Sequence, residues 1–116
     1  MTLIQLLWAL SCVIAISAGQ LLFKVAGMEI MAVGSWESWK VLRIVGIAAI
    51  IYGLATLLWI HLLSQVPLNK AYVIMASSFI LVPLSSHFLF HEVLTIGYLI
   101  GAVIIFLGIV VATQFG

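Results

Sequence analysis

The sequence predicts an all-α membrane protein with four transmembrane helices joined by short loops. Of its 116 residues, 66% are hydrophobic and 6% are charged, and the mean hydropathy is +1.42, which excludes an ordinary soluble domain. A helix needs about 20 apolar residues to cross the ~30 Å hydrocarbon core of a bilayer, so four crossings occupy most of the chain. Charged side chains interrupt the apolar sequence only at Lys24, Glu29, Glu37, Lys40, Arg43, Lys70 and Glu92.

The uncharged runs between these positions define the expected spans. We expect a single domain over residues 1–116, with spans at about 2–23, 44–64, 71–90 and 95–114. The first run lacks the basic segment that begins a signal peptide, so we expect it to be retained. Residues 24–40 form the longest expected loop, Pro67 lies in a tight hairpin, and residues 91–95 form the last connection. Pro83 predicts a kink near Phe79, whose carbonyl loses its helical donor.

Positive charge is concentrated around the first loop. Lys24, Lys40 and Arg43 flank it, whereas Lys70 is the one basic side chain of the second loop. By the positive-inside rule, the first loop lies in the cytoplasm and both termini lie outside. The bias of three to one also leaves a dual topology open.

The composition excludes several functional classes. A net charge of +1 offers no basic surface for nucleic acid and no acidic tail for a cationic partner. Cys12 is the single cysteine, so no internal disulfide can form. The sequence has no phosphate-binding glycine loop, nucleophile elbow or HExxH motif, and His87 and His91 beside Glu92 are a weak metal signal. We therefore expect no enzyme activity, no metal and no cofactor.

Polar groups share one face of the first span, where Gln20 and Lys24 lie one turn apart. A buried amide costs several kcal/mol in hydrocarbon unless it has a partner. Two interpretations remain open: a hydrogen bond between helices, with Lys24 extending to the interface, or a polar path lined by these groups.

The second and third spans carry further candidates. Tyr52 and Trp59 share a face that serves either packing or binding. Lys70 and Ser77 align on the third span, and a lysine at a helix N-terminus favours either anion binding or anchoring of the topology.

Small residues form a strip on the last span. Gly97, Gly101 and Gly108 fall within about 40° of one another at 100° per residue. Such strips let helix backbones approach closely in lipid. The strip therefore predicts a helix contact, either within the chain or with a second subunit.

Three segments resemble the drug/metabolite transporter superfamily: SAGQLLFK at residues 17–24, VPLNKAY at 66–72, and FLFHEVLTIGYLIGAVIIFLGIVV at 88–111. The chain is similar to the four-span members, the small multidrug resistance proteins and, more closely, the aminoarabinose-phosphoundecaprenol flippase subunits. The resemblance implies half of an inverted-repeat transporter in a bacterial inner membrane, and the positive-inside rule then places its termini in the periplasm. Such a half pairs with itself or with a sister four-span subunit.

The resemblance also bears on the function of the first span and on the glycine strip of the last span. Small multidrug resistance proteins carry a functional glutamate eight residues before the lysine that ends span one, and Ile16 stands at that position here. No expected span contains an acidic side chain deep in the membrane, where proton-coupled export of a cation requires one. The spacing of Gly101 and Gly108 matches the strip through which those proteins dimerise.

The resemblance implies a transporter subunit that moves an undecaprenyl-phosphate-linked sugar, or a related lipid phosphate, between leaflets of the bilayer. The residues themselves add cations at the span ends and no acid within the spans. Candidate phosphate ligands are Lys24, Lys70 and Arg43, and candidate headgroup residues are Gln20, Tyr52, Trp59 and Ser77. One alternative is an exporter of small amines or drugs. Another is an accessory subunit of a membrane glycosyltransferase.

The charge bias predicts the orientation of the termini. A reporter that is active only in the cytoplasm should stay silent when it is fused to the C-terminus, because the positive-inside rule places that terminus outside. Strong reporter activity would contradict this orientation, and equal activity of cytoplasmic and periplasmic reporters would indicate dual topology.

Overall fold

The computed structural model describes residues 2–115 and is helical over that range, without a β-strand. Its helices are α1 (Leu3–Val33), α2 (Trp39–Leu63), α3 (Leu68–Met75), α4 (Ser78–Phe90) and α5 (Ile96–Phe115). Because α3 and α4 together make one apolar segment, Leu68–Phe90, four segments are long enough to cross a membrane. The predicted fold class is confirmed.

Helix α1 continues through half of the expected first loop, so the prediction of a loop from residue 24 onward was wrong. Its 31 residues reach about 46 Å at 1.5 Å per residue, which exceeds the ~30 Å hydrocarbon core. The last turns can therefore carry charge outside the hydrocarbon without ending the helix. Gly34 ends it in the left-handed conformation, with φ 72° and an N–H bond to the Ile30 carbonyl. At the other end, Thr2 and Gln5 form a capping box.

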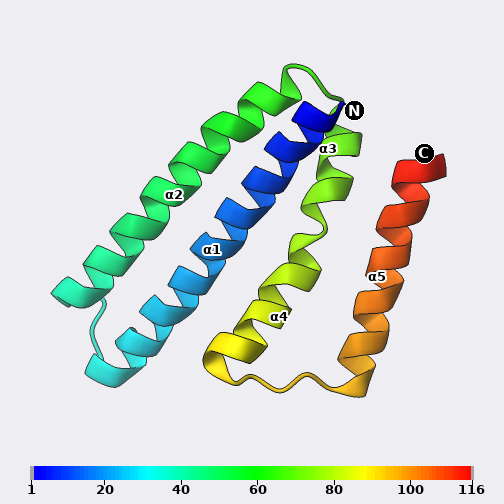
Figure 1. Cartoon of the computed structure of the whole chain (residues 1–116). Helices are drawn as coiled ribbons and strands as arrows, with labels where there is room; N and C mark the ends of the chain where they lie inside the picture. The colour runs from blue at the N-terminus through cyan, green and yellow to red at the C-terminus, as the bar shows by residue number, and fades with distance from the viewer. Residues whose placement is uncertain (1, 116) are drawn as a thin grey trace.

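Helices α1 and α2 pack side by side along most of their length (Figure 1). The buried residues of α1 are mostly small, and those of α2 are apolar, which allows a close approach of the two backbones. At Gly19 the approach is so close that a Cβ atom would overlap the Tyr52 ring. One apolar cluster, made of Ala9, Leu62, Val66 and Ala71, joins this pair to the start of α3.

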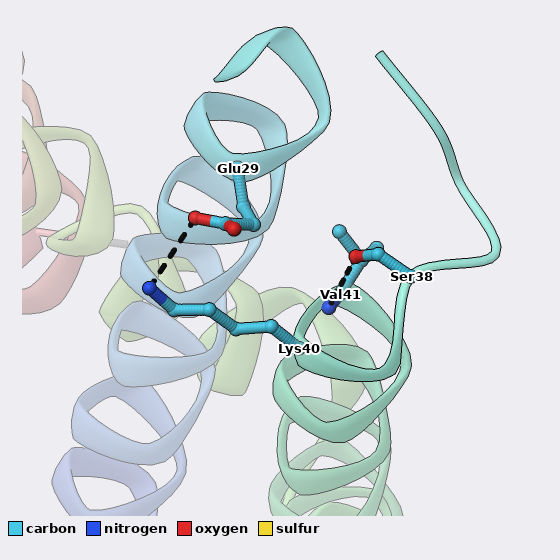
Figure 2. A network of polar contacts seen from close by, with 4 residues as sticks. All are labelled: Glu29, Ser38, Lys40 and Val41. Carbon is cyan, nitrogen blue, oxygen red and sulfur yellow. Dashed lines mark hydrogen bonds and ion pairs between the residues drawn. The ribbon is translucent and has the colours of Figure 1, made fainter. Parts of the chain in front are cut away.

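An ion pair and a helix cap hold the loop between α1 and α2 (Figure 2). Lys40 Nζ lies 3.4 Å from Glu29 Oε2, and the Ser38 hydroxyl accepts the Val41 N–H at 3.2 Å. Lys40 is 59% exposed, so its pair contributes at most about 1 kcal/mol. These contacts orient the charges at this end rather than supply much stability.

The third span is broken between Met75 and Ser78, which is earlier than the kink expected near Phe79. Pro83 has no N–H to offer the Phe79 carbonyl, and its ring crowds that turn. The Tyr98 hydroxyl of α5 donates to this free carbonyl at 3.0 Å. Ser77 lies at the break, where its hydroxyl donates to the Ile74 carbonyl at 2.8 Å. The backbone irregularity thus ties α5 to α4.

The helices form a thin layer in the order α2, α1, α3 with α4, and α5 (Figure 1). Its principal extents are 49, 37 and 17 Å, and the last is little more than the ~10–12 Å diameter of one helix. The radius of gyration is 16.2 Å, against about 13 Å for a compact chain of this length. Helix α5 forms one edge, and none of its described residues is buried. Both broad faces of the layer are therefore open.

The contact between Gly19 and Tyr52 predicts a specific loss of stability. Gly19→Ala should destabilise the protein by about 1–3 kcal/mol, because the added methyl group forces α1 and α2 apart. The measurement is unfolding of the purified protein in a detergent titration. Gly46→Ala is the matched control, since nothing lies within 4 Å of its added Cβ, and alanine is the better helix former. Equal effects of the two substitutions would contradict the packing.

Candidate substrate-binding site

A cavity of about 330 Å³ lies between α1, α4 and the start of α5. Its polar lining residues are Gln20, Lys24, Ser86, Glu92 and Tyr98. Lys24 is exposed, two turns before the end of α1. The first and last loops lie at the same end of the layer (Figure 1). The cavity thus combines a cation, an acid, an amide and two hydroxyl groups toward that end.

Helices α1 and α2 position the amide of this cavity. Gln20 Nε2 donates to Tyr52 Oη at 2.6 Å, and Phe23 stacks on the Tyr52 ring, with the centroids 5.4 Å apart and the planes at 22°. The structure therefore brings together two of the predicted headgroup residues. Gln20 meets a neighbouring helix and also lines a cavity, so the two interpretations left open by the sequence coexist at this residue.

The other wall comes from α4 and the loop that follows it. His91 ends α4 in the left-handed conformation, with φ 58°. His87 Nδ1–H donates to the Glu92 carbonyl at 2.6 Å, which folds the loop back against the helix. Ser86 donates to the Pro83 carbonyl at 2.9 Å, leaving its oxygen lone pairs available to a ligand. The sequence analysis did not place Ser86 and Tyr98 in the site; the hydroxyl groups near Pro83 were the available signal.

A second cavity, of about 460 Å³, lies at the opposite end of the layer between α1, α3 and α5. Lys70 and Asn69 line it beside Thr113 and Gln114. The Asn69 side-chain oxygen accepts the Lys70 backbone N–H at 2.9 Å, which positions the first turn of α3. Lys24 and Lys70 thus lie at opposite ends of the protein and cannot bind one phosphate together.

The third cavity, of about 280 Å³, is mostly apolar and lies between the other two. Ile16 and Trp59 line it together with Tyr72 and Phe79. Trp59 therefore lies apart from the contact between Gln20 and Tyr52. No carboxylate lines this cavity, and the isoleucine that stands where a family relative carries glutamate faces it.

Three predicted site residues do not line these cavities. Tyr52 contacts the first cavity only through its bond to Gln20. Arg43 is exposed on α2, two residues beyond the buried Val41, on a different side of the helix. Ser77 is bonded to its own helix at the α3–α4 break. Their roles in binding substrate stay predictions.

The glycine strip on α5 makes no contact with another helix. Nothing lies within 4 Å of a Cβ built at Gly101 or Gly108, and at Gly97 the nearest atom is the neighbouring Thr95 hydroxyl. The sequence allows the strip to contact a helix of the same chain or a helix of a second subunit. Among residues 2–115 the contact within the chain is absent, so the contact between subunits stays a prediction.

A polar cluster at the terminal end was missed from the sequence. Gln5 Nε2 donates to Gln65 Oε1 at 3.2 Å, and Gln65 Nε2 lies 3.5 Å from His61 Nε2. The His61 ring packs 4.8 Å from the Trp8 ring. This cluster links α1 to the α2–α3 hairpin. Within residues 2–115, no group of three metal-binding side chains occurs.

The four long apolar helices define a small multi-pass membrane protein. The EamA-like transporter family matches residues 3–114, and the chain therefore belongs to the EamA-like transporter family. The predicted relationship to this superfamily is confirmed. Four spans and bacterial relatives make it a multi-pass protein of a bacterial inner membrane.

Relatives point to one branch of the family. A protein of Yersinia pestis (strain Pestoides F), named "Probable 4-amino-4-deoxy-L-arabinose-phosphoundecaprenol flippase subunit ArnE", is 38% identical over 68 residues, 59% of this chain and 60% of that protein. A protein of the same name from Hamiltonella defensa subsp. Acyrthosiphon pisum (strain 5AT) is 38% identical over 69 residues, 60% of this chain and 62% of that protein. The matches therefore span about three fifths of these relatives. No solved structure matches the chain.

Proposed function

We propose that this protein is a transporter subunit that moves an undecaprenyl-phosphate-linked sugar, or a related lipid phosphate, between the two leaflets of the membrane. The observation that carries the proposal is a lysine lining a cavity at each end of the helix layer, Lys24 at one end and Lys70 at the other. The names of the relatives from Yersinia and Hamiltonella support the choice of substrate.

This arrangement suits a phosphate attached to a long lipid tail. A phosphate in hydrocarbon must be neutralised and hydrogen-bonded, and each lysine provides both where the headgroup enters or leaves. Gln20 provides an amide in the Lys24 cavity, held in place by its bond to the Tyr52 hydroxyl. The Trp59 indole and the Tyr72 ring line the middle cavity, where they offer flat apolar surfaces to a sugar. Because the layer is open on both faces, the tail can remain in lipid while the headgroup crosses.

A proton-coupled exporter of amines fits these cavities less well. Such a transporter holds either a proton or its cation on a carboxylate within the membrane, and Ile16 occupies the corresponding position beside the middle cavity. An accessory subunit of a glycosyltransferase would have no use for a lysine in a cavity at each end. Transport of a quaternary ammonium ion by this chain alone would favour the exporter.

The proposed transporter contains two chains, either identical or sister subunits. Helix α5 carries Gly101 and Gly108 on a surface that no residue of the described range 2–115 covers, and small residues are the usual contact surface between membrane helices. A second chain packed against this strip would cover one edge of the layer. The family resemblance to inverted-repeat transporters favours the same arrangement.

Lys24 and Lys70 should each be required for transport of the lipid phosphate. Lys24→Ala and Lys70→Ala should each lower translocation of a lipid phosphate about tenfold or more, because a hydrogen bond to a charged group contributes about 1.5–3 kcal/mol. The measurement is headgroup accessibility in vesicles reconstituted with the full chain and any sister subunit that co-purifies with it.

Lys40→Ala is the matched control, because Lys40 pairs with Glu29 at the α1–α2 loop and lines neither lysine cavity. Wild-type rates in both cavity variants, at equal protein levels, would contradict the proposal.

The glycine strip gives an independent test of the assembly. Gly101→Leu combined with Gly108→Leu should shift the protein from dimer to monomer in native mass spectrometry, because bulky side chains prevent close approach of the helices. Gly53→Leu serves as the control, since it adds the same bulk on α2 where nothing lies within 4 Å of its Cβ. A dimer that survives the double substitution would place the interface elsewhere.

A further inference from the structure

The cavity beside Lys24 contains charges of both signs that do not neutralise each other. Lys24 and Glu92 line the same 330 Å³ space. In the described part of the chain, the one ion pair joins Lys40 to Glu29, at a different place on the fold. The cavity therefore offers a ligand a cation and a carboxylate at once.

Contacts around Glu92 hold the acid at the wall of this cavity. The Glu92 carbonyl accepts the His87 Nδ1–H at 2.6 Å, so the histidine contacts the backbone and leaves the carboxylate free. Three residues later, the Thr95 hydroxyl accepts the Tyr98 N–H at 3.1 Å and begins α5. The Tyr98 hydroxyl is in turn bonded to the Phe79 carbonyl of α4. The segment that carries the acid is thus tied to α4 on both sides.

We propose that this cavity binds a zwitterionic lipid headgroup, with its phosphodiester at Lys24 and a primary ammonium group at Glu92. The inference rests on the proposed function, since it assumes a lipid phosphate, and it adds the residue, Glu92, that selects among headgroups. Gln20 and Ser86 line the same cavity and can bond to sugar hydroxyl groups.

The physical reason is charge complementarity. A headgroup with a phosphate alone gains from Lys24 but meets the negative charge of Glu92 in the same small space, and like charges in a partly desolvated site repel. A headgroup with an added ammonium group turns that repulsion into attraction. Glu92 therefore acts as a specificity residue, because it rejects lipid phosphates that lack the amine.

Two kinds of lipid share this chemistry, an amino-sugar phosphodiester of a polyprenol and phosphatidylethanolamine. The experiment measures the affinity of the full chain in lipid nanodiscs, by native mass spectrometry, for three probes. These are an undecaprenyl phosphodiester of an amino sugar, the same lipid with its amine acetylated, and phosphatidylethanolamine.

The wild-type protein should bind the free amine at least about tenfold more tightly than the acetylated lipid, the scale of a hydrogen bond between charged groups. Glu92→Gln should remove this preference and leave affinity for the acetylated lipid equal or higher. Glu37→Gln is the matched control, because it makes the same change in the α1–α2 loop, outside the cavity, and it should keep the preference.

The probes separate the possible outcomes. Tighter binding of the amino-sugar lipid than of phosphatidylethanolamine supports the site and identifies its ligand as a lipid-linked sugar, whereas equal binding that depends on Glu92 supports the site and identifies a phospholipid. Absence of an amine preference in the wild type, or a preference that survives in Glu92→Gln, overturns the inference while lipid phosphate binding stands. If the wild type binds none of the probes, the proposed function fails and the inference fails with it.

Discussion

Hydrocarbon offers no hydrogen-bond partner, and this constraint decides how the helices of this protein meet. The carbonyl that Pro83 leaves without a donor is bonded by the hydroxyl of Tyr98 on another helix. The amide of Gln20 finds the hydroxyl of Tyr52 in the same way. Each of these two bonds therefore also joins two helices. Ser17 is an exception among the described residues, because its buried hydroxyl has no partner.

A thin layer of helices has consequences for transport. One layer does not enclose a path, so the cavities lie along its length and open toward whatever covers the layer. A single chain leaves helix α5 poorly packed. None of its described residues is buried, and no described residue covers its glycine strip. A second half would complete both the helix packing and the path, whereas an open side next to lipid suits a substrate that keeps its tail in the bilayer.

Particular residues show how far sequence reasoning reached. The length of the apolar runs predicted four spans, because bilayer thickness alone determines that length. The end of α1 was misplaced, because charged residues were treated as a loop although a helix can continue beyond the hydrocarbon. The sequence predicted that the Gln20 amide would need a hydrogen-bond partner in hydrocarbon, but it did not identify Tyr52 as that partner. Trp59 was grouped with Tyr52 by periodicity, yet it lies two turns further along α2 and lines the third cavity, whereas Tyr52 bonds to Gln20.

The sequence by itself determined the class of protein, its family and the absence of an acid in the spans, because apolar length and the order of charges are properties of the chain alone. The order of the spans already places Lys24 and Lys70 at opposite ends, because consecutive loops lie on opposite sides of a membrane. Only the tertiary structure decided that Glu92 shares a cavity with Lys24. The physical reason is that one span is broken before Pro83 and the last is held to it by Tyr98. Contacts between segments that are far apart in the sequence depend on how the helices pack. The periodicity of a single helix carries no information about that packing.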